Sequence, residues 1–192
     1  MAHSIILLPL IGFLISCSLS FFKSNKFIDR AAEIITSLFI TITAIFSFYI
    51  FIDNIGDPSI VSIKLFNWIS SGSFNADWSI YLDTATRVML VVITSVSALV
   101  HIYSIGYMSH DDSKPRFMGY LSLFTFAMLM LVTADNFLQL FFGWEGVGLA
   151  SYLLIGFWYK KPTANAAAIK AFIVNRICLL YTSDAADDVA SV

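Results

Sequence analysis

The stretch NFLQLFFGWEGVGLASYLLIGFWY at residues 136–159 carries a single charged residue, Glu145, and is long enough to cross a lipid bilayer. A helix needs about 20 largely apolar residues to span a hydrocarbon layer roughly 30 Å thick. Other long apolar runs lie on both sides of this stretch, at residues 5–22, 31–52, 84–108, 117–133 and from residue 164 onward. We therefore predict an all-α polytopic membrane protein with about six transmembrane helices.

The composition supports the same class. Hydrophobic residues make up 58% and charged residues 12% of the 192 residues, and the mean hydropathy is +0.81. A soluble protein of this composition would be coated in apolar surface, so we expect the lipid bilayer as its surroundings. The net charge of −2, without a dense Lys/Arg cluster, argues against nucleic acid as a partner.

Basic residues concentrate in alternate connections between the predicted spans. They follow spans one, three and five or open the sixth: Lys23, Lys26, Arg30, Lys114, Arg116, Lys160, Lys161 and Lys170. Cytoplasmic loops of membrane proteins collect Lys and Arg, so the N-terminus is predicted outside. The first span is expected to stay uncleaved, because the residues before it contain no Lys or Arg.

In the connection between spans two and three, the hydrophobic residues recur with a period of two and not with the period of a helix. Hydrophobic and polar residues alternate over residues 74–83, less cleanly over 61–65, and the turn-forming run SSGS lies between them at 70–73. This pattern predicts a β-hairpin, with a disordered loop as the alternative.

Glu145 is the principal candidate for chemistry. A carboxylate inside a membrane helix is costly and is usually retained where it pairs with another group or moves charge. It lies about 14 Å along its helix, near the bilayer midplane. A proton relay fits that depth, and a carboxyl that is only satisfied by a neighbouring helix is the structural alternative. The small residues around it, in GWEGVGLAS, would let another helix or water approach closely.

Three further residues could take part in proton translocation. Arg176 in the sixth helix could share the depth of Glu145 if the two helices are antiparallel neighbours. Lys170 lies nearer the inner face, where it could pass a proton inward or extend to the interface. His101 could titrate near neutral pH, although a histidine hydrogen-bonded to a neighbour is the commoner outcome.

Redox chemistry has no motif in this sequence. It contains no GxGxxG, no P-loop, no paired-histidine haem pattern and no cysteine cluster, since Cys17 and Cys178 are far apart. We expect no cofactor and no metal ion in this chain.

Three segments carry a resemblance to a known family. LVHIYSIGYM at residues 99–108, the run from RFMGYL to LIGFWY at 116–159, and AAAIKAFIVNR at 166–176 resemble the antiporter-like subunit L of bacterial NADH-quinone oxidoreductase, called subunit 5 in mitochondrial complex I. The motif GWEGVGLASYLLIGF is the most specific part, and the likeness covers residues 5–176, roughly the first third of such a subunit.

The resemblance implies a proton half-channel that contains Glu145. The family pairs this glutamate with a lysine on its seventh helix, which this chain lacks, so the chain is not expected to pump alone. FMN, iron–sulfur clusters and quinone are expected in partner subunits. The implied partners are other membrane subunits of complex I, especially the neighbouring antiporter-like subunit. The implied location is the bacterial cytoplasmic membrane, or the mitochondrial inner membrane for an organellar source.

The organisation predicted from these observations has four parts. Residues 1–56 form helices one and two, 57–83 form the extracytoplasmic hairpin, 84–177 begin the antiporter-like domain, and 178–192 form a tail. The tail CLLYTSDAADDVASV departs from the family pattern, which continues with Gly-Asp, and is interpreted as non-native. Two alternatives to the complex I function remain: a large subunit of a sodium/proton antiporter without redox partners, and a membrane scaffold without transport.

Overall fold

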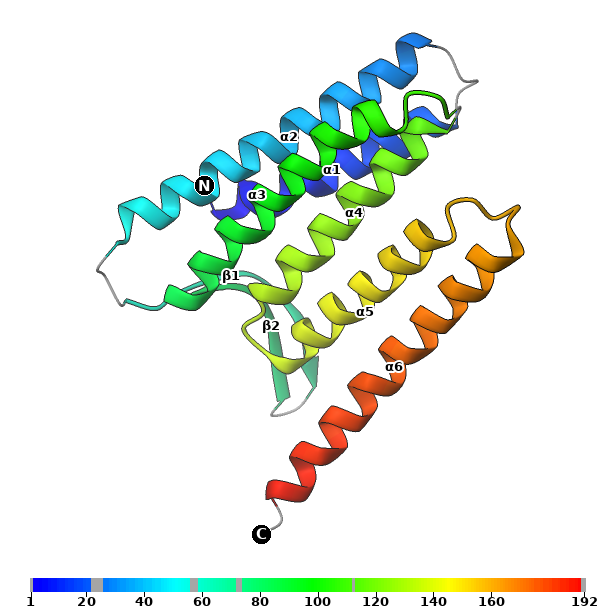
Figure 1. The fold of residues 1–192 in the computed structure, drawn as a ribbon. Helices are drawn as coiled ribbons and strands as arrows, with labels where there is room; N and C mark the ends of the chain where they lie inside the picture. The colour runs from blue at the N-terminus through cyan, green and yellow to red at the C-terminus, as the bar shows by residue number, and fades with distance from the viewer. Residues whose placement is uncertain (1, 22–25, 56–58, 72–73, 112, 191–192) are drawn as a thin grey trace.

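Six helices and a β-hairpin make up the described part of the chain (Figure 1). The computed structural model describes residues 2–21, 26–55, 59–71, 74–111 and 113–190, without the side chains of 71, 74 and 179–190. In chain order the elements are α1 (Ala2–Ser20), α2 (Lys26–Asp53), β1 (Val61–Ser71), β2 (Phe74–Leu82), α3 (Thr84–Tyr107), α4 (Lys114–Val132), α5 (Phe137–Ile155) and α6 (Pro162–Ala190). The predicted all-α membrane fold with a hairpin after the second helix is confirmed.

Several helix ends follow from local sequence. The side chain of Asp83 accepts a hydrogen bond from the Thr86 backbone N–H at 2.6 Å and begins α3. Asn136 does the same for the Gln139 N–H at 2.9 Å and begins α5. These side chains satisfy backbone donors that have no partner within the helix. At α4, Pro115 stands in the first turn, where its missing N–H costs nothing.

The β-hairpin pairs β1 and β2 in antiparallel register, from Val61 opposite Leu82 to Ser71 opposite Phe74. The register shifts twice, between Lys64 and Phe66 and between Asn67 and Ile69, where β1 has the less regular alternation. Such shifts bend a strand and increase its twist. The predicted turn residues Gly72 and Ser73 lie outside the described residues.

Gln139 fixes the hairpin to the helices. This fully buried side chain in α5 accepts from the Ser79 N–H at 3.1 Å and donates to the Ser79 C=O at 2.8 Å. The Tyr81 N–H donates to the Thr133 C=O at 3.0 Å, so β2 also bonds to the end of α4. Because buried backbone groups are costly to leave unpaired, these bonds hold β2 against the α4–α5 connection.

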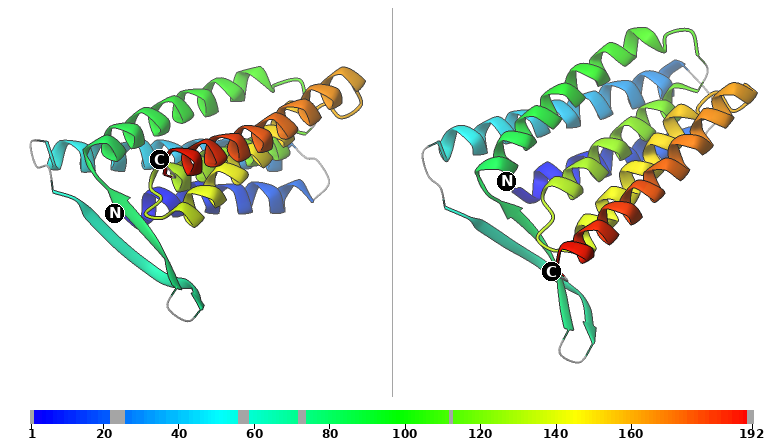
Figure 2. Two further views of the ribbon diagram at one scale, coloured as in Figure 1. Left: turned by 90° about the horizontal axis from the view of Figure 1, so that it is seen from below. Right: turned by 60° about the horizontal axis from the view of Figure 1, so that its bottom comes forward.

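The helices lie side by side, and the hairpin covers one end of the bundle (Figures 1 and 2). α1 packs on α2 and α4, α2 on α3 and α4, and α4 on α3 and α5, whereas the described part of α6 packs extensively on α5 alone. The main hydrophobic cluster lies near the hairpin and joins Ile5, Ile80, Leu90, Leu129 and neighbouring side chains. α6 is therefore the outermost helix of the described structure.

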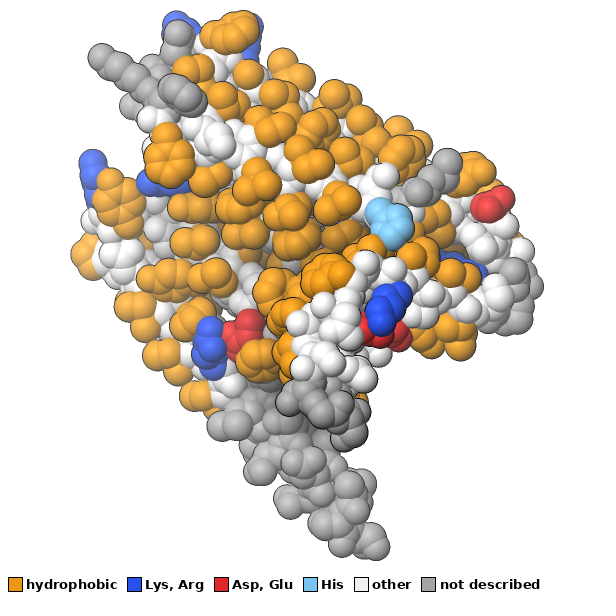
Figure 3. All heavy atoms as spheres, turned by 180° about the vertical axis from the view of Figure 1, so that it is seen from behind, with side chains coloured by type: hydrophobic (Ala, Val, Ile, Leu, Met, Phe, Trp, Pro, Cys, Tyr) orange, Lys and Arg blue, Asp and Glu red, His pale blue; other side chains and the backbone are white. Residues whose placement is uncertain are grey.

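The outer surface is that of a membrane protein. Five helices, α1 to α5, are long and apolar enough to cross a membrane, and hydrophobic side chains cover much of the face in Figure 3. α6 is not among these helices; its side chains are described only as far as residue 178, and Lys170 and Arg176 lie in that part. Thus the number of helices agrees with the sequence prediction, while the sixth is less apolar than the others.

Two ends of the bundle can now be defined. The end that carries the hairpin is the hairpin end, and the opposite end, with the α1–α2, α3–α4 and α5–α6 connections, is the basic end (Figure 1). The described basic residues of these connections and of the helix ends beside them are Lys26, Arg30, Lys114, Arg116, Lys160 and Lys161. Lys23 lies outside the described residues. The alternation of basic and non-basic connections predicted from the sequence therefore corresponds to two physical ends.

Candidate functional site

The site lies on the interface between α5 and α6. Gly148 of α5 meets the side chain of Asn175, and Trp144 Nε1 donates to the Asn175 C=O at 3.4 Å. One turn further toward the basic end, the rings of Tyr152 and Phe172 lie with centroids 5.6 Å apart. The absence of a side chain at Gly148 allows this approach, as the small residues around Glu145 predict.

Glu145 and Arg176 form an ion pair across this interface. The Nη2 atom of Arg176 lies 2.5 Å from Oε2 of Glu145, and the side chains are 52% and 17% exposed, respectively. The two charged groups are in contact, but among the described residues Oε2 of Glu145 has no partner with hydrogen-bond geometry. The guanidinium also lies over the Phe172 ring, 4.6 Å from its centroid. The sequence hypothesis that Glu145 and Arg176 share a depth is confirmed in this structure.

The pair stands halfway along α5, whose bounds are Phe137 and Ile155. At that depth an isolated carboxylate would lose most of its hydration, and a neighbouring cation offsets this cost. Because Arg176 is half exposed, it can move away from Glu145 more easily than a fully packed side chain. In the arrangement shown, the Arg176 guanidinium compensates the charge of an ionised Glu145.

Lys170 is not brought to this pair. It is exposed on α6, two residues from both Ala168 and Phe172, which contact α5. Two residues correspond to about 200° around a helix, so Lys170 points away from α5. Its role in proton transfer remains a prediction.

His101 is fully buried between α3 and α4. Its Nδ1 lies 2.8 Å from the Ser97 carbonyl oxygen, and its Nε2 lies 3.2 Å from Oγ of Ser122. A carbonyl oxygen only accepts, so Nδ1 carries a proton, and in a neutral ring Nε2 accepts from Ser122. The Ser97 hydroxyl extends this group to Thr125 Oγ1 at 2.5 Å. Within the described residues, no hydrogen bond or ion pair links the His101 ring directly to Glu145.

A second ion pair was not predicted from the sequence. Nζ of Lys114, at the start of α4, lies 3.4 Å from Oε1 of Glu33 in α2, and the two side chains are 18% and 6% exposed. Glu33 could have been noticed in the sequence, because it interrupts an apolar run. Its partner Lys114 could not, because it lies about 80 residues away in the chain. This pair joins α2 to α4 near the basic end. Among the described residues, no group of three or more His, Cys, Asp or Glu could hold a metal ion.

The fold and the site define a multi-pass α-helical membrane protein with a mid-depth carboxylate paired to an arginine. Residues 68–118 match the family model described as NADH-Ubiquinone oxidoreductase (complex I), chain 5 N-terminus, and residues 134–181 match NADH:quinone oxidoreductase/Mrp antiporter, TM. With curated relatives at 50% to 59% identity, these matches show that the chain belongs to the family of subunit L and chain 5 of complex I.

The relatives come from bacteria and from organisms with mitochondria. The chain is 59% identical to NADH-quinone oxidoreductase subunit L of Rickettsia felis over 79% of its length, which is 24% of that protein. It is 50% identical to the subunit L of Rhodobacter capsulatus over 92% of its length, 25% of that protein. It is 51% identical to NADH-ubiquinone oxidoreductase chain 5 of Marchantia polymorpha over 90% of its length, 25% of that protein. The chain spans about a quarter of the length of these relatives, less than the third expected from the resemblance.

Proposed function

We propose that this chain forms the first part of a proton pathway in an antiporter-like membrane subunit of NADH-quinone oxidoreductase. Glu145 takes up and releases the proton, and Arg176 is the counter-ion that stabilises its ionised form. The observation that carries this proposal is the ion pair at mid-depth on the α5–α6 interface. Family membership supports it, because the relatives are named as subunits of that oxidoreductase.

The physical basis is the cost of charge in a bilayer. With Arg176 in contact, the carboxylate of Glu145 is compensated, and once the arginine withdraws, the neutral acid becomes the less costly form. Movement of one cation can therefore drive binding and release of one proton. His101 and its hydroxyl partners are proposed as a separate polar group between α3 and α4, and Lys170 as a proton carrier nearer the basic end.

Electron transfer is assigned to other subunits. We expect FMN, iron–sulfur clusters and quinone to be bound by partners of this chain and not by the chain itself. The partners are other membrane subunits of complex I, and the neighbouring antiporter-like subunit is expected to contact this one. The basic end faces the cytoplasm of a bacterium, or the matrix in a mitochondrion.

A sodium/proton antiporter subunit is the second candidate, because the family model for residues 134–181 is described for both classes. The two functions differ in their coupling. Proton transfer that needs NADH oxidation supports the oxidoreductase, and sodium-driven proton transfer without NADH supports the antiporter.

The test is Glu145→Gln in the full-length parent subunit within its assembled complex. Gln keeps the size of Glu but cannot bind and release a proton, so we expect a large loss of protons pumped per NADH oxidised. Asp135→Asn is the control, since Asp135 is an exposed acid at the hairpin end. Unchanged pumping by Glu145→Gln would contradict the proposal and favour a scaffold.

A further inference from the structure

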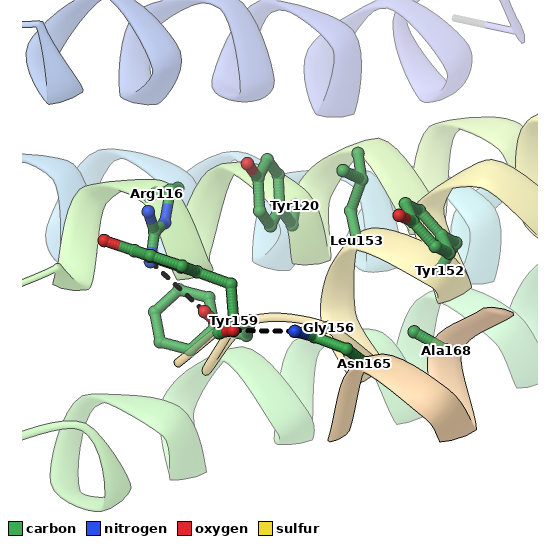
Figure 4. A pocket seen from close by; sticks show the side chains of 9 residues that line it. Arg116, Tyr120, Tyr152, Leu153, Gly156, Tyr159, Asn165 and Ala168 are labelled. Atoms are coloured by element: carbon green, nitrogen blue, oxygen red, sulfur yellow. Dashed lines mark hydrogen bonds between the residues drawn. The ribbon is translucent and has the colours of Figure 1, made fainter. Parts of the chain in front are cut away.

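A pocket of about 230 Å³ opens at the basic end between α4, α5 and α6 (Figure 4). Arg116 and Tyr120 of α4 form one side, and Tyr152 and Gly156 near the end of α5 form another. The α5–α6 connection and the first turns of α6 complete the lining, including Asn165. The pocket lies apart from the Glu145–Arg176 pair, about two or more turns nearer the membrane surface.

Arg116 gives this pocket its charge. Its Nη2 donates to the Phe157 C=O at 3.3 Å, and its guanidinium lies 4.7 Å from the centroid of the Phe157 ring and 5.5 Å from that of Tyr159. Within the described structure, no carboxylate forms an ion pair with Arg116, and its Nε is buried without a hydrogen-bond partner. The aromatic rings therefore hold a cation whose charge is not compensated by the described residues.

The other polar groups of the pocket suit an anion. Tyr120 and Tyr152 also line the pocket, and a tyrosine hydroxyl can donate a hydrogen bond to a ligand. The Asn165 side chain already makes a hydrogen bond within the chain, since its Nδ2 donates to the Tyr159 C=O at 2.7 Å. No acidic residue lines the pocket among those described. Arginine with hydroxyl donors is a typical arrangement for phosphate oxygens.

The position of the pocket favours a lipid as the source of that phosphate. Lys160 and Lys161 lie in the adjoining connection, and Lys161 Nζ is 5.4 Å from the centroid of the Trp158 ring. Trp158 and Tyr159 are 42% and 59% exposed, as aromatic residues at the level of lipid headgroups often are. Basic pockets between helices at the cytoplasmic face can bind anionic headgroups.

We propose that this pocket binds the phosphate group of an anionic phospholipid, with Arg116 and the hydroxyl of Tyr120 as its ligands. The shared chemistry is a phosphate oxyanion at the membrane surface, which free phosphate could also supply. This inference is independent of proton transport. It assigns the pocket to the attachment of a specific lipid between α4, α5 and α6.

Native mass spectrometry of the 192-residue chain in detergent tests the proposal, with phosphatidylglycerol, phosphatidylcholine and inorganic phosphate as probes. We expect preferential binding of phosphatidylglycerol and at least about tenfold weaker binding by Arg116→Gln, because a charge-assisted hydrogen bond is lost. Arg30→Gln is the matched control, since it removes an exposed cation of the same end, from α2. Its affinity should stay within about twofold of the wild type.

A conservative variant covers the case in which Arg116→Gln does not fold. Tyr120→Phe removes one hydroxyl and should weaken binding about fivefold, whereas Tyr107→Phe, at an exposed position near the end of α3, should not. Binding of inorganic phosphate with the same dependence on Tyr120, and no binding of phosphatidylglycerol, would support the phosphate site and assign it to a soluble source. Affinities of both pocket variants equal to the wild type would overturn the proposal. If Arg116→Gln is unfolded, an unchanged Tyr120→Phe overturns it alone.

Discussion

Glu145 and Arg176 contribute differently to their ion pair. The glutamate is mostly enclosed, whereas the arginine is half exposed and rests on the Phe172 ring. Enclosure makes the ionised glutamate dependent on its partner, while exposure leaves the arginine free to change position. This asymmetry at the scale of single residues supports the proposal that Glu145 binds and releases a proton.

Asp83 gives a prediction that depends on pH. The hydrogen bond from the Thr86 backbone N–H holds the pKa of Asp83 below its ordinary value of 3.8. A lowered native pKa means that the cap stabilises the fold above pH 3.8 and that this contribution is lost as the pH falls through the native value. We expect Asp83→Ala to lower the free energy of unfolding at pH 7 by about 1 kcal/mol.

Denaturation of both forms in detergent at several pH values measures this contribution. The difference between wild type and Asp83→Ala should shrink toward acidic pH, because the protonated carboxyl accepts less strongly. A difference that is constant from neutral to strongly acidic pH would show that Asp83 acts only through packing.

The sequence predicted how deep a residue lies along its helix, but not the direction in which its side chain points. Counting residues from the helix ends placed Glu145 and Arg176 at one level, because the helical rise is constant. It could not show that Lys170 points away from α5, since the rotation of a helix about its axis is set by packing. The contact of His101 with Ser122 and that of Ser97 with Thr125 depend on the same unknown register.

At the scale of elements, Gly143 sets the distance between α4 and α5. A Cβ atom at Gly143 would lie 2.6 Å from Cα of Leu131, so the backbones would have to separate. We expect Gly143→Ala to lower the free energy of unfolding by about 1–3 kcal/mol, as overpacking does. Thermal denaturation in detergent measures the effect.

Gly106 is the matched control near the end of α3. A Cβ there meets nothing within 4 Å, so Gly106→Ala should be neutral or stabilise by up to about 1 kcal/mol. Equal effects of Gly143→Ala and Gly106→Ala would contradict the close approach of α4 and α5.

The elements themselves were largely predictable. Apolar runs predicted the helices, and the alternation over residues 74–83 predicted β2. The two register shifts and the bonds between Gln139 and Ser79 were not predicted, because they depend on how β1, β2 and α5 meet. Such contacts between distant segments leave no periodic trace in a sequence.

At the scale of the whole molecule, α6 is the least firmly held helix of the described structure. Its extensive packing is on α5 alone, and Ala168 is the only buried residue among its described side chains. We expect the amides of α6 to exchange with deuterium faster than those of α4, which packs on four other helices: α1, α2, α3 and α5. Equal protection of α4 and α6 in a lipid nanodisc would contradict this arrangement.

The pocket at the basic end illustrates the limit of sequence reasoning for the whole molecule. Arg116 was predicted to lie on the cytoplasmic side, as one of several basic residues. Its enclosure by α4, α5 and α6 could not be predicted, because three segments must be placed together before the pocket exists. The Glu33–Lys114 pair has the same origin, a contact between helices that are separated in the chain.

Infrared difference spectroscopy of the full-length subunit in its assembled complex tests the central claim most directly. The measurement compares resting and turning-over enzyme in the carboxyl stretching region, with Glu145→Gln to assign the band. We predict a carboxyl band that changes between the two states and is absent from the variant. A Glu145 carboxyl that stays in one ionisation state throughout turnover would contradict its role as a carrier of protons.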